Sequence, residues 1–416
     1  MSGEFKHPVE MIRQILVDLI DGRTGHAARL DASQWRDLAV MARQHRLEPL
    51  LHSHHDSLAG VVPESLLASW SAAHRHAAMR SLQIQRTLIL IDRALAAADI
   101  PYVALKGAWL AWHGYAHPAL RPMRDVDILV PPDQLVDAFR ALEQSGFSQR
   151  SVGVPIEHAL AHDKHLPPLM CRDTGVPVEI HRRITDYAGT VGTATRFDDP
   201  ARILARSRRM AVGGHGIAFP DPSDSLLHLI IHAVVDHRFN NGPQILPDVE
   251  AALRSSINWP EFWSMAAGGG WEKACQLVLA LARWHRHTMP DVPVAPTPDN
   301  GLPDQAVLDC CTQLMLATGT EGERTMMSIG LAGSIAGVGK ARRVDRIAAL
   351  VRRVVPAPHV LATFAGQPSG SRNVWRHYPA WALDRLRRMG ETLQPQVQRD
   401  VQRHHRVGAW LFGERP

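Results

Sequence analysis

The stretch RPMRDVDILV, residues 121–130, decides how the whole chain is interpreted. Its second half is rich in β-branched and apolar residues, which predicts a strand. Asp125 and Asp127 stand one residue apart in it, and because side chains alternate between the two faces of a strand, both carboxylates point the same way. Their Cα atoms lie roughly 6.6 Å apart at the rise of a strand. Like charges this close repel each other, so the stretch predicts either a solvated strand face or a site for a divalent cation.

The preceding segment, IPYVALKG (residues 100–107), predicts a shorter strand that ends at Lys106 and Gly107. A glycine there lets the backbone approach a phosphate, and the helix predicted after it can direct its N-terminus at the same anion. Lys106 can add a positive charge. Arg121 and Arg124 flank the aspartate strand and can hold a phosphate or pyrophosphate, although an ordinary charged turn explains them equally well.

A third carboxylate follows in PVEIHRR, residues 177–183, where Glu179 stands between Val178 and Ile180 in a predicted strand. Mg²⁺ in sites of phosphoryl chemistry is usually bound by carboxylates from neighbouring strands, so Glu179 is the candidate third ligand. His181 is two residues further on and therefore shares the face of Glu179, where it can tune that carboxylate or contact an acceptor; a satisfied strand histidine is an equal alternative. His165 lies close in sequence and is a candidate of the same kind.

The hydrophobic pattern predicts an α+β fold in which a small sheet lies between helical regions. Residues 1–100 show the three- and four-residue apolar spacing of helices, and residues 101 to about 195 predict a core of three or four strands with a helix or two. After residue 195 the chain returns to helices, with residues 196–290 packing on the core and residues 291–416 forming a C-terminal helical region that includes a helix at residues 341–355. A proline-rich connector covers residues 288–304.

Composition limits the classes of function. The 416 residues are 45% hydrophobic, contain no apolar run long enough to span a membrane and begin with no signal peptide. The four cysteines form no CxxC pair, which favours a reducing cytoplasm. A net charge of +5 permits an anionic substrate, but no platform of aromatic and basic residues predicts nucleic-acid binding. We therefore expect a cytoplasmic protein with neither a membrane nor a nucleic acid as partner.

Three polar residues lie four apart on one face of a helix predicted at residues 224–239: His228, His232 and Asp236. Histidines at this spacing can bind a metal, but the sequence implies no third ligand. The helix is otherwise apolar, so we expect it to pack near the carboxylates, with His232 or Asp236 contacting an acceptor.

The order of these elements resembles the polymerase-β-like nucleotidyltransferase superfamily. More closely, it is similar to a bacterial family described as uncharacterised nucleotidyltransferases, over about residues 30 to 260. The resemblance is carried by six segments: LKGAWL, RPMRDVDILV, KHLPPLM, VPVEIHRR, DSLLHLIIHAVVDHRF and LPDVEAAL. The chain departs from the superfamily's pattern at one point: it has Lys106–Gly107–Ala108 after the first strand, where the superfamily usually has Gly-Ser.

The resemblance implies a small mixed-sheet nucleotidyltransferase core and a metal-dependent transfer of a nucleoside monophosphate from an NTP to a hydroxyl or phosphate. Asp125 and Asp127 hold one or two Mg²⁺ or Mn²⁺ ions in this scheme. Glu179 ligates the catalytic metal and helps to deprotonate the acceptor, while Lys106, Gly107, Arg121 and Arg124 contact the nucleotide. A peptide, a sugar and a natural-product precursor are all open as acceptors.

Two other functions stay open. The Asp-x-Asp signature also occurs in transferases that hold a nucleotide-sugar through a divalent metal, although those place it after a nucleotide-binding α/β region where this chain is helical. A catalytically inactive binding protein that keeps the nucleotidyltransferase fold is the second alternative.

Overall fold

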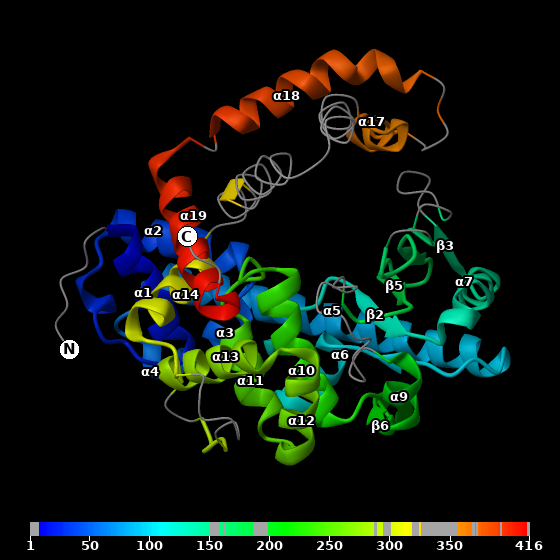
Figure 1. Ribbon diagram of the computed structural model, residues 1–416. Helices are drawn as coiled ribbons and strands as arrows, with labels where there is room; N and C mark the ends of the chain where they lie inside the picture. Colours follow the sequence, from blue (N-terminus) through cyan, green and yellow to red (C-terminus); the bar gives the residue numbers. More distant parts are fainter. Residues whose placement is uncertain are drawn as a thin grey trace.

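A computed structural model gives the structure of the chain (Figure 1). It describes residues 8–149, 156, 159–160, 163–185, 199–286, 289–293, 301–317, 324–325, 356–367, 371, 373–391 and 393–413. The helix predicted at residues 341–355 and part of the connector at residues 288–304 lie outside the described residues.

A mixed sheet of five strands carries the aspartate stretch. Its order is β1 (Val103–Ala104), β2 (Val126–Leu129), β5 (Pro177–His181), β4 (Leu169–Cys171) and β3 (Phe147–Gln149). β2 and β5 are parallel, and the other neighbouring pairs are antiparallel. This sheet between N-terminal and C-terminal helices confirms the predicted α+β class.

The pairing of β2 with β5 sets the geometry of the carboxylates. The two strands are in register so that Asp127 lies beside Glu179, while Val126 pairs with Val178 and Ile128 with Ile180. These four apolar side chains are buried. Because side chains of paired residues point to the same face of a sheet, burial of the apolar set turns both carboxylates to the opposite face.

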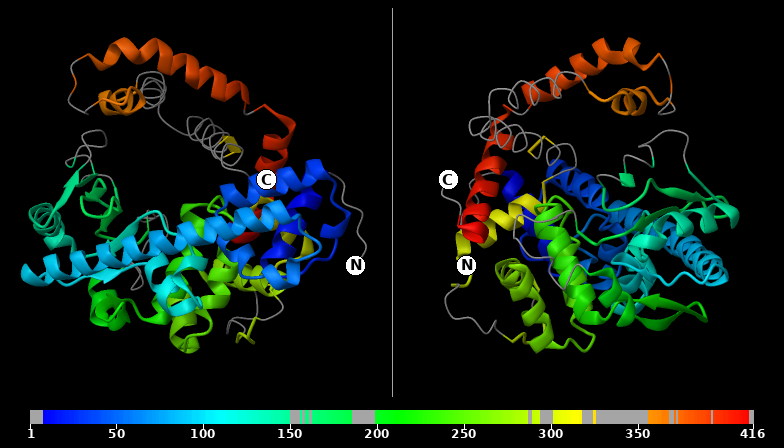
Figure 2. Two further views of the ribbon diagram at one scale, coloured as in Figure 1. Left: turned by 180° about the vertical axis from the view of Figure 1, so that it is seen from behind. Right: turned by 45° about the vertical axis from the view of Figure 1, so that its right-hand side comes forward.

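The N-terminal helices are α1 (Pro8–Ile20), α2 (Ala32–Gln44), α3 (Glu48–His52), α4 (His55–Leu58) and α5 (Glu64–Ala97). Asp31 and Gln34 form a capping box that starts α2. The 34-residue helix α5 runs from the N-terminal helices to the sheet and packs against β2 and against α7 (Leu135–Gln144) (Figure 2). It thereby fixes the N-terminal helices relative to the strands.

The chain after the sheet differs in one respect from the helical region that the sequence predicts. Helix α9 (Pro200–Ala205) leads into a hairpin of β6 (Arg208–Val212) and β7 (His215–Phe219), so the expectation of helices alone is wrong here. Gly213 and Gly214 form the turn with positive φ, which favours glycine. The hairpin contains few alternating apolar residues, and two of its strand positions are arginines, so its pattern is weak.

Helices complete the fold. They are α10 (Pro222–Ile231), which continues as a π-helical turn at His232–Asp236, α11 (Ile245–Ala252), α12 (Trp259–Gly269), α13 (Glu272–His285), α14 (Gln305–Met315), α17 (Pro358–Phe364), α18 (Tyr378–Glu391) and α19 (Pro395–Phe412). Figure 1 shows α19 against α14, and α18 at the outer edge of the molecule.

One cluster of buried apolar residues extends from Ile12 in α1 to Val407 in α19 and includes the sheet. The sheet and the helices on both sides of it in the sequence therefore share a core, and the domain boundaries near residues 100, 195 and 290 stay predictions. Among the described residues no helix is long and apolar enough to cross a membrane. All four cysteines are free.

Candidate active site

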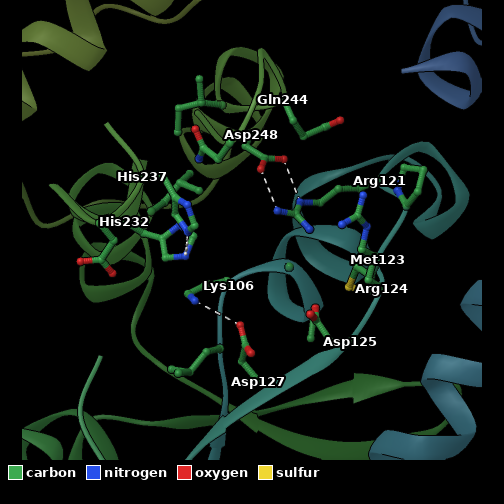
Figure 3. A pocket seen from close by; sticks show the side chains of 18 of the residues that line it. Lys106, Arg121, Met123, Arg124, Asp125, Asp127, His232, His237, Gln244 and Asp248 are labelled. Carbon is green, nitrogen blue, oxygen red and sulfur yellow. Dashed lines mark hydrogen bonds and ion pairs between the residues drawn. The ribbon is translucent and has the colours of Figure 1, made fainter. Parts of the chain in front are cut away.

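A cavity of about 730 Å³ lies over the carboxylate face of the sheet (Figure 3). Its walls come from the ends of β1, β2 and β5, the turn between α2 and α3, the π-helical turn after α10, and α11. Eleven candidate residues from the sequence line it, and so does one further arginine, Arg46. The eleven are Lys106, Gly107, Arg121, Arg124, Asp125, Asp127, His165, Glu179, His181, His232 and Asp236.

 

Two carboxylates and a histidine converge at the centre of this cavity. Asp127, Glu179 and His181 each offer a ligand atom, and these atoms lie within 4.8 Å of one another. Asp125 lines the same cavity just before β2 but stands outside this group. The sequence predicted three converging carboxylates; the structure brings two of them together with His181, and the role of Asp125 as a ligand stays a prediction.

Asp127 is held by two partners, a lysine and a histidine. Lys106 Nζ donates to Asp127 Oδ2 at 3.2 Å, and His181 Nε2 lies 3.3 Å from Oδ1. Although burial opposes ionisation, the charge of Lys106 and the hydrogen bond with His181 hold the pKa of Asp127 well below its ordinary value. Asp127 is therefore an anion ready to bind a cation.

Glu179 lies between two histidines. The Nε2 atoms of His165 and His181 are each 3.6 Å from Glu179 Oε2. Burial opposes its charge, but the close contact with His181 and the nearby His165 lower the pKa of Glu179. His181 is buried, which disfavours its charge, yet its hydrogen bond with Asp127 and its close contact with Glu179 raise its pKa. The prediction that His181 faces the carboxylates is confirmed.

Asp125 has a different environment. Its side chain makes no hydrogen bond or ion pair with any residue that the structure describes. Desolvation by the surrounding protein, and next the negative charges of Asp127 and Glu179, raise the pKa of Asp125. A divalent cation would remove this repulsion, and the oxygen-rich donor set with one imidazole fits a hard cation such as Mg²⁺ or Mn²⁺.

Lys106 reaches Asp127 from a strained backbone. Its φ of 44° and ψ of −107° belong to a region that residues with a side chain rarely adopt. The next residue, Gly107, has no room for a side chain, because a Cβ atom there would collide with the guanidinium of Arg121. In this structure Gly107 thus allows the close approach of Arg121, and its contact with a nucleotide stays a prediction.

Arg121 is already engaged. Its Nε and Nη2 atoms donate to the two carboxylate oxygens of Asp248 at 2.8 Å each, and the Tyr115 hydroxyl donates to Asp248 at 2.7 Å. The ion pair is buried, with side-chain exposures of 14% for Arg121 and 4% for Asp248. The structure therefore gives Arg121 an architectural partner in place of the free guanidinium that a phosphate clamp needs. Asp248 was not predicted as a site residue; the feature of the sequence that points to it is its place in LPDVEAAL, one of the segments that carry the family resemblance.

The opposite wall is built by polar residues of the π-helical turn. Asp236 accepts from Lys164 Nζ at 2.8 Å, and the Nε2 atoms of His232 and His237 lie 3.1 Å apart. Figure 3 shows His232 and His237 across the cavity from Asp127, with Lys106 between them. His228 is buried outside the cavity lining, and burial holds its pKa well below the ordinary value. Its ring lies edge-on to that of His232, with the two ring centroids 6.1 Å apart.

Comparison with known protein families identifies the family of this chain. A family model described as "Uncharacterised nucleotidyltransferase" matches residues 31–286, which is more than half of the chain. The chain belongs to this nucleotidyltransferase family. No curated protein matches it.

The match covers every residue that lines the cavity of this nucleotidyltransferase except Ala317. The matched region begins at Asp31, the N-cap of α2, and ends at Arg286, directly after α13. The turn that carries Arg46 and the helix that carries Asp248 are therefore part of the family unit, together with the five-stranded sheet. The sequence resemblance to this family is confirmed.

Proposed function

We propose that the protein transfers a nucleoside monophosphate from an NTP to a hydroxyl or phosphate acceptor in the presence of Mg²⁺ or Mn²⁺. The observation that carries the proposal is the parallel register that sets Asp127 beside Glu179, with Asp125 lining the same cavity. Membership of the nucleotidyltransferase family supports it.

Asp125, Asp127 and Glu179, with His181 beside them, are the residues that would hold the cation. When bound, the cation would stabilise negative charge on the phosphate oxygens. Glu179 accepts the proton of the acceptor hydroxyl, since its low pKa keeps it ionised, and its contacts with His165 and His181 fix its orientation. The acceptor oxygen then forms a bond to the α-phosphorus, the bond from that phosphorus to its bridging oxygen breaks, and pyrophosphate leaves.

The acceptor occupies the wall formed by His232, His237 and the Lys164–Asp236 pair in this proposal. This wall offers donors and acceptors of hydrogen bonds across the cavity from Asp127. A peptide, a sugar or a natural-product precursor with a hydroxyl group suits such a surface. His232 is kept neutral by burial, which holds its pKa well below the ordinary value, so it can accept as well as donate.

Calorimetry tests the donor. Each NTP is titrated with Mg²⁺ or Mn²⁺ into the wild type, into Asp127→Asn and into Asp133→Asn, an exposed aspartate outside the cavity that serves as the control. We expect metal-dependent micromolar binding that Asp127→Asn loses and Asp133→Asn keeps. Tighter binding of a UDP-sugar than of any NTP would assign a nucleotide-sugar donor, and absence of all binding would assign an inactive binding protein.

A further inference from the structure

The cations that line the cavity fall into two groups. Lys106, Arg121 and Lys164 are each paired with a carboxylate, at distances of 3.2, 2.8 and 2.8 Å. The side chains of Arg46 and Arg124 form no hydrogen bond or ion pair with any residue in the described part of the chain. Both are exposed at the cavity. Two guanidinium groups are thus available to an anionic ligand.

The backbone at Arg46 is unusual for an arginine. Helix α2 ends in a Schellman motif, in which Leu47 N donates to Ala42 O at 2.9 Å and Arg46 N donates to Arg43 O at 3.0 Å. Arg46 is the residue after the C-cap and has a φ of 56°, a conformation that glycine adopts without strain. The chain therefore has a long, positively charged side chain at a position where helix termination favours glycine. This side chain lines the cavity.

Arg46, Arg124 and Asp125 line the same cavity. Partial desolvation by the protein, and next the positive charge of Arg124, lower the pKa of Arg46 to about 10, while Asp125 opposes this shift. Arg46 remains charged at neutral pH. An anion between the guanidinium groups would relieve their mutual repulsion, and the position beside Asp125 puts that anion next to the aspartate strand.

We infer that Arg46 and Arg124 bind the polyphosphate tail of the nucleotide donor beside Asp125. This inference rests on the proposed function and adds a residue from the N-terminal helices to the substrate site. Guanidinium groups suit the task because they donate two parallel hydrogen bonds to phosphate oxygens. Lys106, Arg121 and Lys164 are already neutralised by carboxylates, so the polyphosphate tail binds to Arg46 and Arg124 in this inference.

The test compares three ligands by calorimetry with the full chain: inorganic tripolyphosphate, an NTP and the corresponding NMP, each with Mn²⁺. The variants are Arg46→Gly, Arg124→Ala and, as the matched control, Arg238→Gly. Arg238 is also an exposed arginine with positive φ (47°), and it does not line the cavity. Because glycine relieves the backbone at residue 46, we expect the melting temperature of Arg46→Gly to equal or exceed that of the wild type.

We expect Arg46→Gly and Arg124→Ala each to weaken binding of the NTP and of tripolyphosphate at least about tenfold, as loss of a charge-assisted hydrogen bond predicts, with NMP binding unchanged. Wild-type affinity of Arg46→Gly for the NTP, or an equal loss for the NMP, would overturn the inference and leave the proposed function standing. If the wild type binds no NTP, the proposed function fails and the inference fails with it.

Discussion

Asp127 on β2 lies beside Glu179 on β5 in the parallel pairing of the two strands, and His181 contacts both carboxylates. Parallel strands place residues of equal register on the same face. Two segments about fifty residues apart in the sequence therefore deliver anions to one point. We expect these anions to bind a divalent cation.

Replacing Glu179 by Gln keeps the size of the side chain and removes one anionic ligand. We expect the affinity for Mn²⁺ in the absence of nucleotide to fall at least about tenfold, the scale on which changes around metal ligands act. Electron paramagnetic resonance measures this affinity, because it detects the free Mn²⁺ in a titration. Glu143→Gln, an exposed glutamate at the end of α7, is the control. Equal Mn²⁺ affinity of wild type and Glu179→Gln would contradict a metal site here.

Lys106→Met tests what keeps the carboxylates together when no cation is bound. The substitution leaves Asp127 without the partner that lies 3.2 Å away, and we expect the free energy of unfolding in EDTA to fall by about 2–4 kcal/mol. Saturating Mn²⁺ should restore most of this loss, because the metal binds the folded state. Urea unfolding with and without Mn²⁺ provides the measurement.

The control for this experiment is Lys164→Met. Its partner Asp236 is not part of the carboxylate and histidine group, so its loss of stability should not respond to Mn²⁺. A Lys106→Met defect of the same size in EDTA and in Mn²⁺ would show that the lysine acts only in packing.

Arg121→Lys separates a structural role from a nucleotide-binding one. Lysine cannot reproduce the two bonds of 2.8 Å to Asp248, so we expect a loss of about 3–5 kcal/mol in unfolding free energy without any ligand. Asp248→Asn should cause a similar loss, and the double variant should lose less than the sum of the two. Full stability of Arg121→Lys together with weaker NTP binding would instead support the phosphate clamp that the sequence predicted.

Acid should destabilise the protein through its buried histidines. Burial lowers the pKa of His285 to about 4, and its Nε2 donates to the Thr312 hydroxyl at 2.8 Å. The unfolded chain then binds a proton that the folded chain resists, so stability falls as the pH drops from 6.5 to 4. Between these pH values the protonation of His285 lowers the free energy of unfolding by about 3 kcal/mol.

His285→Gln should flatten this pH dependence, while the exposed His76→Gln leaves it unchanged. Urea unfolding at several pH values between 4 and 7 measures the slope. An unchanged slope in His285→Gln would show that this histidine does not stay neutral in the folded chain.

The local pattern of the sequence was enough to predict the strand that contains Asp127, the strand at Glu179, the shared face of Glu179 and His181, and the helical regions around the sheet, although β2 begins one residue after Asp125. The reason is that alternation and helical spacing are properties of neighbouring residues. The family match over residues 31–286 confirmed the resemblance that these motifs carried.

Only the tertiary structure decided which partners the charged residues have. Arg121 is paired with Asp248, which lies 127 residues further along the chain, and Arg46 arrives at the cavity from the end of a distant helix. The hairpin of β6 and β7 likewise lacked a readable pattern. Sequence spacing determines which side of a strand or helix a residue occupies, but the packing of distant elements determines which charge it meets there, and so whether a guanidinium supports the fold or remains available to a substrate.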